Sequence, residues 1–241
     1  MKTVAIGDIH GGLKALKQVI ERANLPSNTQ YIFMGDYVDG WSQSADVIKF
    51  FIEFSKSNDC IFLRGNHDEL LYNYLKTGES NPMWLRVGGE STVQSYKGVT
   101  RIEKKDHIKF LENLVNYHID SENRLFIHGG FTNLHGPEHE YYPNLVYWDR
   151  TLWEMACSLD TSIPMHDDRY PNRLKLFKEI YIGHTPVTRV GHEKPINFAN
   201  VWNVDTGAAF KGKLSMLEVD TKEIWQSDPV HLLYPDETGR N

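Results

Sequence analysis

Side chains that can bind metal ions or transfer protons recur in five short clusters of this sequence, and each cluster directly follows an apolar run. The clusters contain Asp8 and His10, Asp36 and Asp39, Asn66 and His67, His128, and His184. Mixed carboxylate, imidazole and amide ligands suit first-row dications better than Ca²⁺, which prefers oxygen alone, or a structural Zn²⁺, which favours thiolates. Two such ions about 3.5–4 Å apart can bind the reacting oxygens of a phosphoryl transfer and activate a water. The clusters therefore predict a site for two divalent ions, with Mn²⁺ preferred and Fe or Zn²⁺ as alternatives.

Each cluster alone has an ordinary structural explanation. A Gly-Asp pair after a strand is more often a turn with a helix cap than a metal site, because Gly and Asp favour turns and Asp caps helices. His128 and His184, each next to a glycine, could merely satisfy a backbone group. The joint occurrence of five clusters at five expected strand ends is what favours the metal site.

The elements that would position these clusters form a repeated βα pattern. Strands are expected at Thr3–Ile6, Tyr31–Met34 and Ile61–Leu63, and helices at Leu13–Ala23, Asp46–Phe54 and Glu69–Leu75. Continuous apolar strands that alternate with helices predict a largely parallel sheet covered on both faces. Ligands bind such sheets at the carboxyl ends of the strands, so the clusters should meet at one edge. Asp36 is expected to bridge two ions, because it ends the second strand, which would lie between the other two.

The second half of the chain has a less regular pattern. Helices are expected at Phe110–Tyr117 and Leu152–Leu159, loops at Asn133–Tyr147 and Met165–Arg173, and strands at Leu125–His128, Ile180–Ile182, Val201–Val204, Leu214–Val219 and Glu223–Trp225. The tight turn between the last two strands suggests antiparallel pairing. No linker-like segment interrupts the 241 residues, so residues 1–241 are interpreted as a single domain.

Composition limits the partners and the compartment. A formal net charge of −6 gives no general attraction to nucleic acid or to an anionic membrane, so neither is expected as a partner. The start of the chain lacks the features of a signal peptide, and no run of about 18 apolar residues could span a bilayer. The cytoplasm is therefore the expected location, whereas the oligomeric state stays open.

The ordered motifs also resemble a known family. The series GDIHG, GDYVDG, RGNHD, HGG and GHT, closed by VDTGAAF, resembles the phosphoprotein phosphatase family of calcineurin-like metallophosphoesterases, in particular its small bacterial and phage serine/threonine phosphatases. The likeness runs from Lys2 to about Val219. It implies an α/β fold in which two mixed β-sheets are sandwiched between helices in α/β/β/α layers.

The resemblance implies a role for each matching residue. The first metal would be bound by Asp8 and His10, the second by Asn66, His128 and His184, and both by Asp36. His67 would protonate the leaving alkoxide, oriented by Asp39, while a metal-bound hydroxide attacks phosphorus. This pairing makes physical sense, because a neighbouring carboxylate fixes the tautomer of a histidine and raises its pKa.

The sequence departs from the family pattern at the substrate-binding residues. The second motif of the family usually reads GDYVDRG, and its arginine clamps the substrate phosphate, but Gly40 and Trp41 occupy these positions here. Arg150 in WDR matches the other substrate arginine of the family, and Arg86 could replace the missing one. Either could instead be an ordinary surface or ion-paired arginine. Asp205 in VDTGA is expected near the site without being a ligand.

These departures leave several functions open. The leading interpretation is a phosphatase for phosphomonoesters, such as phosphoserine or phosphothreonine in proteins. A dinucleoside polyphosphate hydrolase is the alternative, because the missing arginine and Asp68 in GNHD favour it. A catalytically inactive scaffold would need neither His67 nor Asp39, and a nuclease would need a basic groove. Aromatic residues could stack on a nucleobase, although such residues more often pack internally: Trp41, Trp84, Tyr141, Tyr142 and Trp148.

Overall fold

Five strands form a mixed sheet, and the N-terminal motifs follow three of them. The computed structural model describes residues 1–240. The sheet has the order β10-β9-β1-β2-β3 and comprises β1 (Thr3–Ile6), β2 (Gln30–Phe33), β3 (Asp59–Phe62), β9 (Ser215–Glu218) and β10 (Ile224–Gln226). β1, β2 and β3 are parallel, whereas β9 and β10 add antiparallel strands at one side. The strand that precedes Asp36 therefore lies between its two neighbours, as predicted.

A second five-stranded sheet contains the strands that precede His128 and His184. Its order is β4-β5-β6-β8-β7, with β4 (Tyr117–Ile119), β5 (Arg124–Ile127), β6 (Glu179–Ile182), β7 (Ile196–Phe198) and β8 (Val201–Asn203). The central strands are parallel and the two edges are antiparallel. The βα pattern alone suggested one largely parallel sheet. The two mixed sheets implied by the family resemblance are the ones observed.

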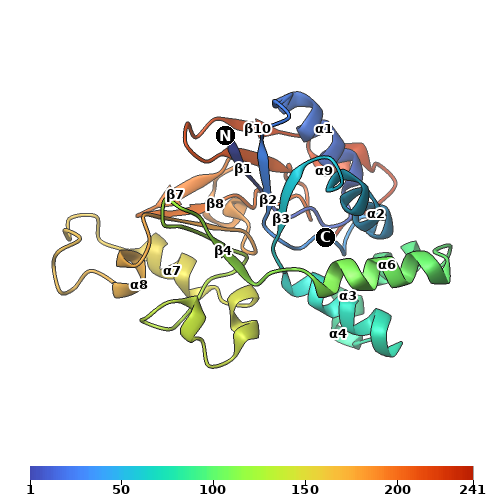
Figure 1. Cartoon of the computed structure of the whole chain (residues 1–241), viewed down its shortest axis with the longest axis horizontal. Helices are drawn as coiled ribbons and strands as arrows, with labels where there is room; N and C mark the ends of the chain where they lie inside the picture. Colours follow the sequence, from blue (N-terminus) through green and yellow to red (C-terminus); the bar gives the residue numbers. More distant parts are fainter. Residues whose placement is uncertain (241) are drawn as a thin grey trace.

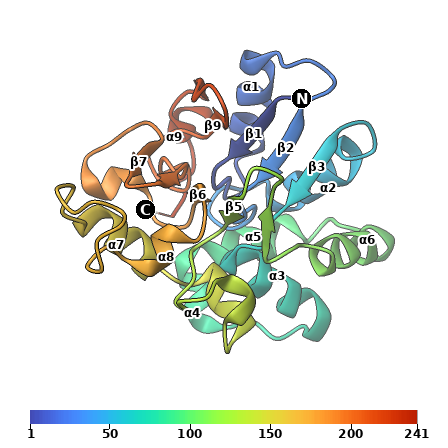
Figure 2. The same ribbon diagram turned by 60° about the vertical axis from the view of Figure 1, so that its left-hand side comes forward.

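Helices cover the outer face of each sheet (Figures 1 and 2). The first sheet is accompanied by α1 (Leu13–Ala23), α2 (Ser44–Phe54), α3 (Asn66–Thr77), α4 (Pro82–Trp84), α5 (Glu90–Ser95), α6 (Arg101–Glu112) and α9 (Val230–Leu233), and the second by α7 (Thr151–Ser158) and α8 (Asn172–Lys175). A π-helical turn, Leu85–Gly89, joins α4 to α5, and 3₁₀ turns occupy Pro137–His139, Pro143–Tyr147 and Val187–Val190. Within residues 1–240, no helix combines the length and the apolar character needed to cross a membrane.

The predicted helix Phe110–Tyr117 is wrong at both ends. Thr100 and Glu103 form a capping box that starts α6 eleven residues before Glu112, its last residue. Val115 then pairs with Leu63 in an isolated β-bridge, which draws the chain away from helical geometry. The following residues enter strand β4. The apolar residues predicted as one helix therefore belong partly to the end of α6 and partly to the start of β4.

Three apolar layers explain why the strands appear in the sequence as continuous apolar runs. Side chains on one face of β1, such as Val4 and Ile6, pack against the helices of the first sheet. Ala5, on the other face, lies between the sheets together with Phe126 and Tyr181. A further cluster lies between the second sheet and its helices. Both faces of the central strands are thus buried, and the layers follow the order α/β/β/α.

Candidate metal centre

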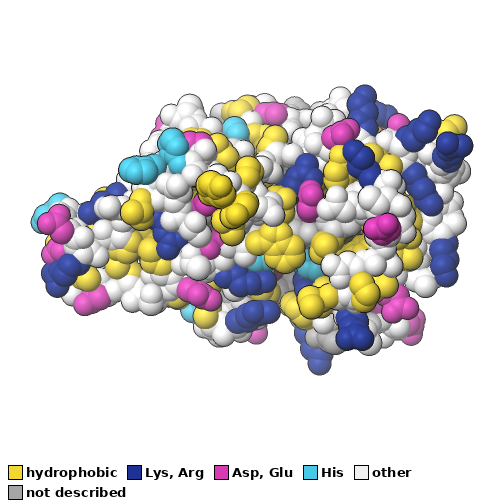
Figure 3. Space-filling model, turned by 90° about the horizontal axis from the view of Figure 1, so that it is seen from below, with side chains coloured by type: hydrophobic (Ala, Val, Ile, Leu, Met, Phe, Trp, Pro, Cys, Tyr) yellow, Lys and Arg dark blue, Asp and Glu magenta, His cyan; other side chains and the backbone are white. Residues whose placement is uncertain are grey.

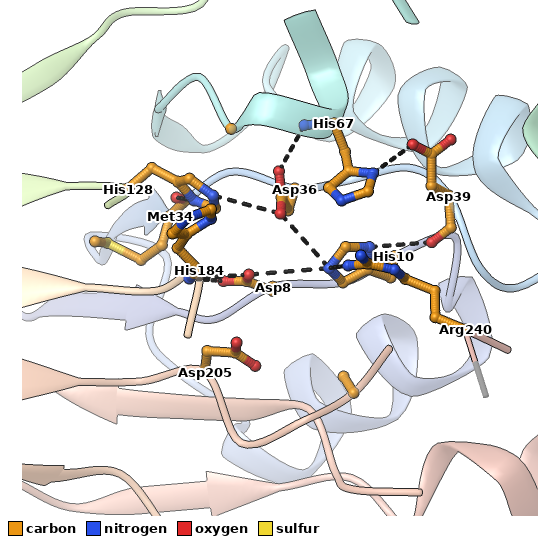
Figure 4. Close-up of polar contacts among 12 residues, drawn as sticks. Asp8, His10, Met34, Asp36, Asp39, His67, His128, His184, Asp205 and Arg240 are labelled. Carbon is orange, nitrogen blue, oxygen red and sulfur yellow. Dashed lines mark hydrogen bonds and ion pairs between the residues drawn. The ribbon is translucent and has the colours of Figure 1, made fainter. Parts of the chain in front are cut away.

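The five predicted clusters meet in one buried site, to which both sheets contribute (Figure 4). Asp8 and His10 follow β1, Asp36 and Asp39 follow β2, Asn66 and His67 begin α3, the helix after β3, His128 follows β5, and His184 follows β6. Each of these side chains is at most 6% exposed. In Figure 4, Asp36 lies between His128 and His10, and Asp205 lies beyond Asp8. The expectation that one edge of the fold gathers the motif residues is therefore met.

The backbone is left-handed at four of these positions. The φ angles are 52° at His10, 51° at Asp36, 72° at Asp39 and 65° at His184. Non-glycine residues adopt such angles rarely, at a cost of about 1–3 kcal/mol each, and they cluster at functional sites. The sharp turns direct these polar side chains toward one shared site at the carboxyl ends of the strands.

Hydrogen bonds fix the orientation of two imidazoles. Nδ1 of His10 donates to two backbone carbonyls of the loop after β2, both at 3.0 Å, and Nδ1 of His128 donates to the carbonyl of Met34 at 2.7 Å. Because a carbonyl can only accept, the lone pair of each ring lies on Nε2 in the neutral form that binds a metal ion. These Nε2 atoms are 3.6 Å and 3.4 Å from Oδ2 of Asp36. The Asp36 carboxylate thus lies between two inward-facing nitrogen donors.

Unpaired buried atoms indicate that the site is built for ions. Oδ1 of Asn66 and Nε2 of His128 and His184 are buried without a hydrogen-bond partner among residues 1–240. An unsatisfied buried polar atom costs about 1–3 kcal/mol, so three around one site call for an explanation. Two groups of potential ligands share Asp36: one adds His10 and His67, the other His128 and His184, with ligand atoms within 4.8 Å of one another. The donors fit a two-metal site.

The electrostatics of the carboxylates point the same way. Burial, with the neighbouring charge of Asp205, raises the pKa of Asp8 well above its usual value. Burial and the charge of Asp36 also raise the pKa of Asp205 to about 6, against a hydrogen bond from the backbone of Gly207. Although burial alone would raise the pKa of Asp36, His128 and His67 hold it well below its usual value. Concentrated negative charge of this kind favours bound cations.

His67 and Asp39 form the predicted pair. Nδ1 of His67 is 2.5 Å from Oδ2 of Asp39, which is fully buried. The same carboxylate accepts from Nε1 of Trp84 and from Oγ1 of Thr92, both at 2.6 Å. Three donors therefore hold Asp39 in place, and Nε2 of His67 is left for the site. The sequence suggested Trp84 only as a residue that could stack on a nucleobase, and it assigned no role to Thr92.

Asp68 supports the turn that carries Asp36. Its carboxylate accepts from the backbone N–H groups of Asp36 at 2.8 Å and of Tyr37 and Gly65 at 2.9 Å. Burial and the charge of Asp36 raise its pKa to about 7. The sequence marked Asp68 only as a departure from the family pattern. Its position three residues after Gly65, at the start of α3, was the available signal.

A cavity of about 250 Å³ opens above the buried cluster. Arg150 lines it and donates to Oγ1 of Thr185 at 2.7 Å and to the carbonyl of His184 at 3.2 Å. Arg240, which the sequence did not single out, also lines this cavity. Arg86 is exposed and lines an adjoining cavity of about 580 Å³ instead.

The aromatic candidates separate into different places. Trp41 and Trp84 are buried, although Trp84 also lines the cavity. Trp148 lines the cavity and is 45% exposed. Tyr141 and Tyr142 are exposed and line neither cavity. Trp148 is therefore the candidate best placed to contact a ligand.

Sequence comparison identifies relatives of nearly full length. The calcineurin-like phosphoesterase family profile matches residues 1–209. The bis(5'-nucleosyl)-tetraphosphatase PrpE (asymmetrical) of Oceanobacillus iheyensis is 26% identical over 239 residues, which covers 92% of this chain and 90% of the relative. The protein of the same name from Bacillus anthracis is 27% identical over 253 residues, with 95% and 96% covered.

Solved structures agree with this assignment at the level of the fold. A candidate diadenosine tetraphosphatase has a TM-score of 0.63 at 15% identity, over 93% of this chain and 92% of that one. A protein serine/threonine phosphatase from Saccharomyces cerevisiae, with similarity to human phosphatase PP5, has a TM-score of 0.58 at 14% identity, over 95% and 80%. Fold, buried cluster and family profile all indicate a metallophosphoesterase, a hydrolase, and the chain belongs to the calcineurin-like phosphoesterase family.

Proposed function

We propose that this protein hydrolyses a phosphoanhydride of a dinucleoside polyphosphate in a metal-dependent reaction. The observation that carries the proposal is the apolar rim of the cavity: Met83, Val87 and Trp148 line it and are 74%, 40% and 45% exposed. Figure 3 shows hydrophobic and basic side chains gathered around the middle of this face, with histidine atoms visible between them. Exposed apolar side chains around a polar cavity suit a nucleobase, which can stack on an aromatic face.

The sizes of the two cavities also suit a long substrate. The cavity above the buried cluster, at about 250 Å³, falls just below the roughly 300–1,000 Å³ of typical small-molecule sites. It would hold the scissile phosphate and one end of a dinucleotide. The adjoining cavity of about 580 Å³ contains Arg86, which would contact a more distant phosphate. A phosphomonoester would need only the first cavity.

The relatives support the same substrate class. Both sequence relatives described above carry the name bis(5'-nucleosyl)-tetraphosphatase, and both align along nearly the whole chain. The motif arginine that would clamp a monoester is absent here, since Gly40 occupies its position. Asp68 in GNHD is the second departure from the family pattern, and it also favours a dinucleoside polyphosphate hydrolase.

The buried residues take the roles expected of a two-metal hydrolase in this proposal. One dication would be held by Asp8, His10 and Asp36, and the second by Asp36, Asn66, His128 and His184, with Mn²⁺ preferred to Fe or Zn²⁺. Such ions, when bound, lower the pKa of a water and neutralise phosphate charge. Arg150 would donate hydrogen bonds to the phosphate, and Asp205 would add negative charge behind Asp8. A cytoplasmic location stays a prediction.

One observation favours the serine/threonine phosphatase as a second candidate. An alkoxide is a poor leaving group and needs a proton from a positioned acid, whereas a phosphate leaves readily without one. The 2.5 Å contact between His67 and Asp39 would hold such an acid in one tautomer. His67 therefore suits a phosphomonoester, while the rim suits a nucleotide, and the two candidates differ in which substrate is cleaved fastest.

The decisive experiment compares initial rates of the manganese-loaded protein on diadenosine tetraphosphate, a phosphothreonine peptide and an aryl phosphate. The proposal expects the dinucleotide to be cleaved fastest and asymmetrically, into AMP and ATP. A faster reaction with the peptide would replace it by the second candidate. No turnover on any of the three, in protein that has bound manganese, would leave only a scaffold. Asp36→Asn serves as the inactive control.

A further inference from the structure

We propose that Arg240, from the segment after α9, supplies the guanidinium that contacts the substrate phosphate in place of the missing motif arginine. This inference rests on the proposed action on a phosphate ester. Cγ of Arg240 lies 3.1 Å from the point where a Cβ on Gly40 would stand, and 3.0 Å from the corresponding point on Gly88. The Arg240 side chain therefore crosses the space that the absence of a side chain at Gly40 leaves free.

The guanidinium of Arg240 faces the buried cluster. Its Nη1 is 3.4 Å from Nε2 of His10, and Figure 4 shows the side chain beside this imidazole. Arg240 lines both the cavity above the cluster and the adjoining cavity. Its Cζ lies 5.5 Å from the ring centre of Phe210, and no acidic side chain within residues 1–240 forms an ion pair with it. Its positive charge is therefore available to an anionic ligand.

The second departure from the family motif anchors this segment. The ring of Trp41 stacks on Tyr234 with centroids 5.3 Å apart, and its Nε1 donates to the carbonyl of Ala208 at 2.7 Å. Gly239 has a φ of 63°, and a Cβ there would stand 2.7 Å from the Trp41 ring. The adjacent Arg240 N–H donates to a backbone carbonyl at 2.9 Å. Trp41 is thus the surface on which the segment lies.

Further contacts hold the segment in register. Glu237 accepts hydrogen bonds from the backbone N–H and the hydroxyl of Ser42, at 2.8 Å and 2.7 Å. The hydroxyl of Tyr234 donates to Gln43 at 2.6 Å. Gly40 leaves room for the arginine and residues 41–43 bind the segment that delivers it. The position of the segment that carries Arg240 therefore accounts for both departures from the motif, Gly40 and Trp41.

Charge explains why a phosphate belongs beside Arg240. A dication held by His10 and the Arg240 guanidinium would repel each other across the cavity unless an anion lies between them. A phosphate oxygen can contact both cations, and the planar guanidinium can donate two parallel hydrogen bonds to it. A lysine offers a point charge on a different stem and would replace only part of this interaction.

The test measures binding of inorganic phosphate to manganese-loaded protein by calorimetry, together with the metal content and the kinetics of the substrate cleaved by wild type. In Arg240→Ala, the Kd for phosphate and the KM should rise about 10- to 100-fold, the loss expected for charged hydrogen bonds, while two metals remain bound. Arg240→Lys should lie between Arg240→Ala and wild type. Glu237→Ala, which loosens the segment, should raise both constants less than Arg240→Ala does.

The control is Arg101→Ala, which removes an exposed arginine at the start of α6 and should change neither constant. Unchanged phosphate binding in Arg240→Ala, with an active wild type, would overturn this inference alone. Tighter manganese binding and faster turnover in Arg240→Ala would also overturn it, because Arg240 would then compete with the metal. A wild type that binds no phosphate and cleaves no ester would instead defeat the proposed function.

Discussion

The floor of the cavity and its rim are built in opposite ways. The floor consists of buried carboxylates and imidazoles on left-handed turns, and its histidines are oriented by backbone carbonyls, as His10 and His128 are. The rim consists of exposed apolar side chains such as Met83 and Trp148, which form no side-chain hydrogen bond with other residues in the range 1–240. A fixed floor suits chemistry whose geometry must not vary. A looser rim suits the selection of one phosphate ester among many.

The largest effect should follow from a change in the floor that both metal groups share. Asp36→Asn removes the charge that lies 3.6 Å and 3.4 Å from the two Nε2 atoms of His10 and His128. We expect at least a ~1,000-fold loss of turnover, about 4 kcal/mol, on every phosphate ester tested. Elemental analysis should also show fewer than two metals per chain. Asp46→Asn, an exposed carboxylate on α2, is the matched control, and equal activity of both variants would contradict a shared ligand.

His67→Asn should have the next largest effect and should depend on the leaving group. If His67 is a proton donor, cleavage of a phosphothreonine peptide should fall about 100- to 10,000-fold, and cleavage of a phosphoanhydride much less. Both metals should stay bound, because this substitution leaves every proposed metal ligand in place. Loss of one metal from His67→Asn would show instead that its Nε2 is a ligand, as its place in a potential ligand group permits.

A change at the rim should alter substrate choice and leave the chemistry intact. Trp148→Ala should raise KM for a dinucleoside polyphosphate about 5- to 100-fold, since stacking contributes ~1–3 kcal/mol per base. Turnover of a small aryl phosphate should stay within twofold of wild type. Tyr141→Ala removes an aromatic ring that is 85% exposed but lines neither cavity, and it should change neither substrate. A parallel loss on both substrates would place Trp148 in the floor.

The contrast between floor and rim also explains what the sequence could predict. Asp8, Asp36 and His128 were found because each lies within three residues of the end of a strand, so local order along the chain fixes their place in space. The same local order placed β2 between its neighbours. Short edge strands such as β4 were missed, because pairing with distant partners creates them and three residues carry no clear period.

Contacts between distant segments account for the site residues that were missed. Arg240 lies against the loop at Gly40 although 200 positions separate the two residues in the sequence. No local sequence pattern predicts this contact. Thr92 reaches Asp39 from a separate helix, 53 positions away along the chain. Arg86 was suggested by residue type alone, and the π-helical turn that carries it lines the adjoining cavity instead.

The smallest expected effect tests whether the rim acts as one surface. Met83→Ala should raise KM for the dinucleotide only about 2- to 12-fold, because methionine contacts with aromatic rings contribute ~0.3–1.5 kcal/mol. The double variant with Trp148→Ala then distinguishes two arrangements. If both side chains enclose the same base, the effects should deviate from additivity by about 0.5–3 kcal/mol; if they contact opposite ends of the substrate, the effects should add. Additive effects, together with an unchanged rate on aryl phosphate, would mean that the rim still selects the substrate. Met83 and Trp148 would then contact it at two separate sites.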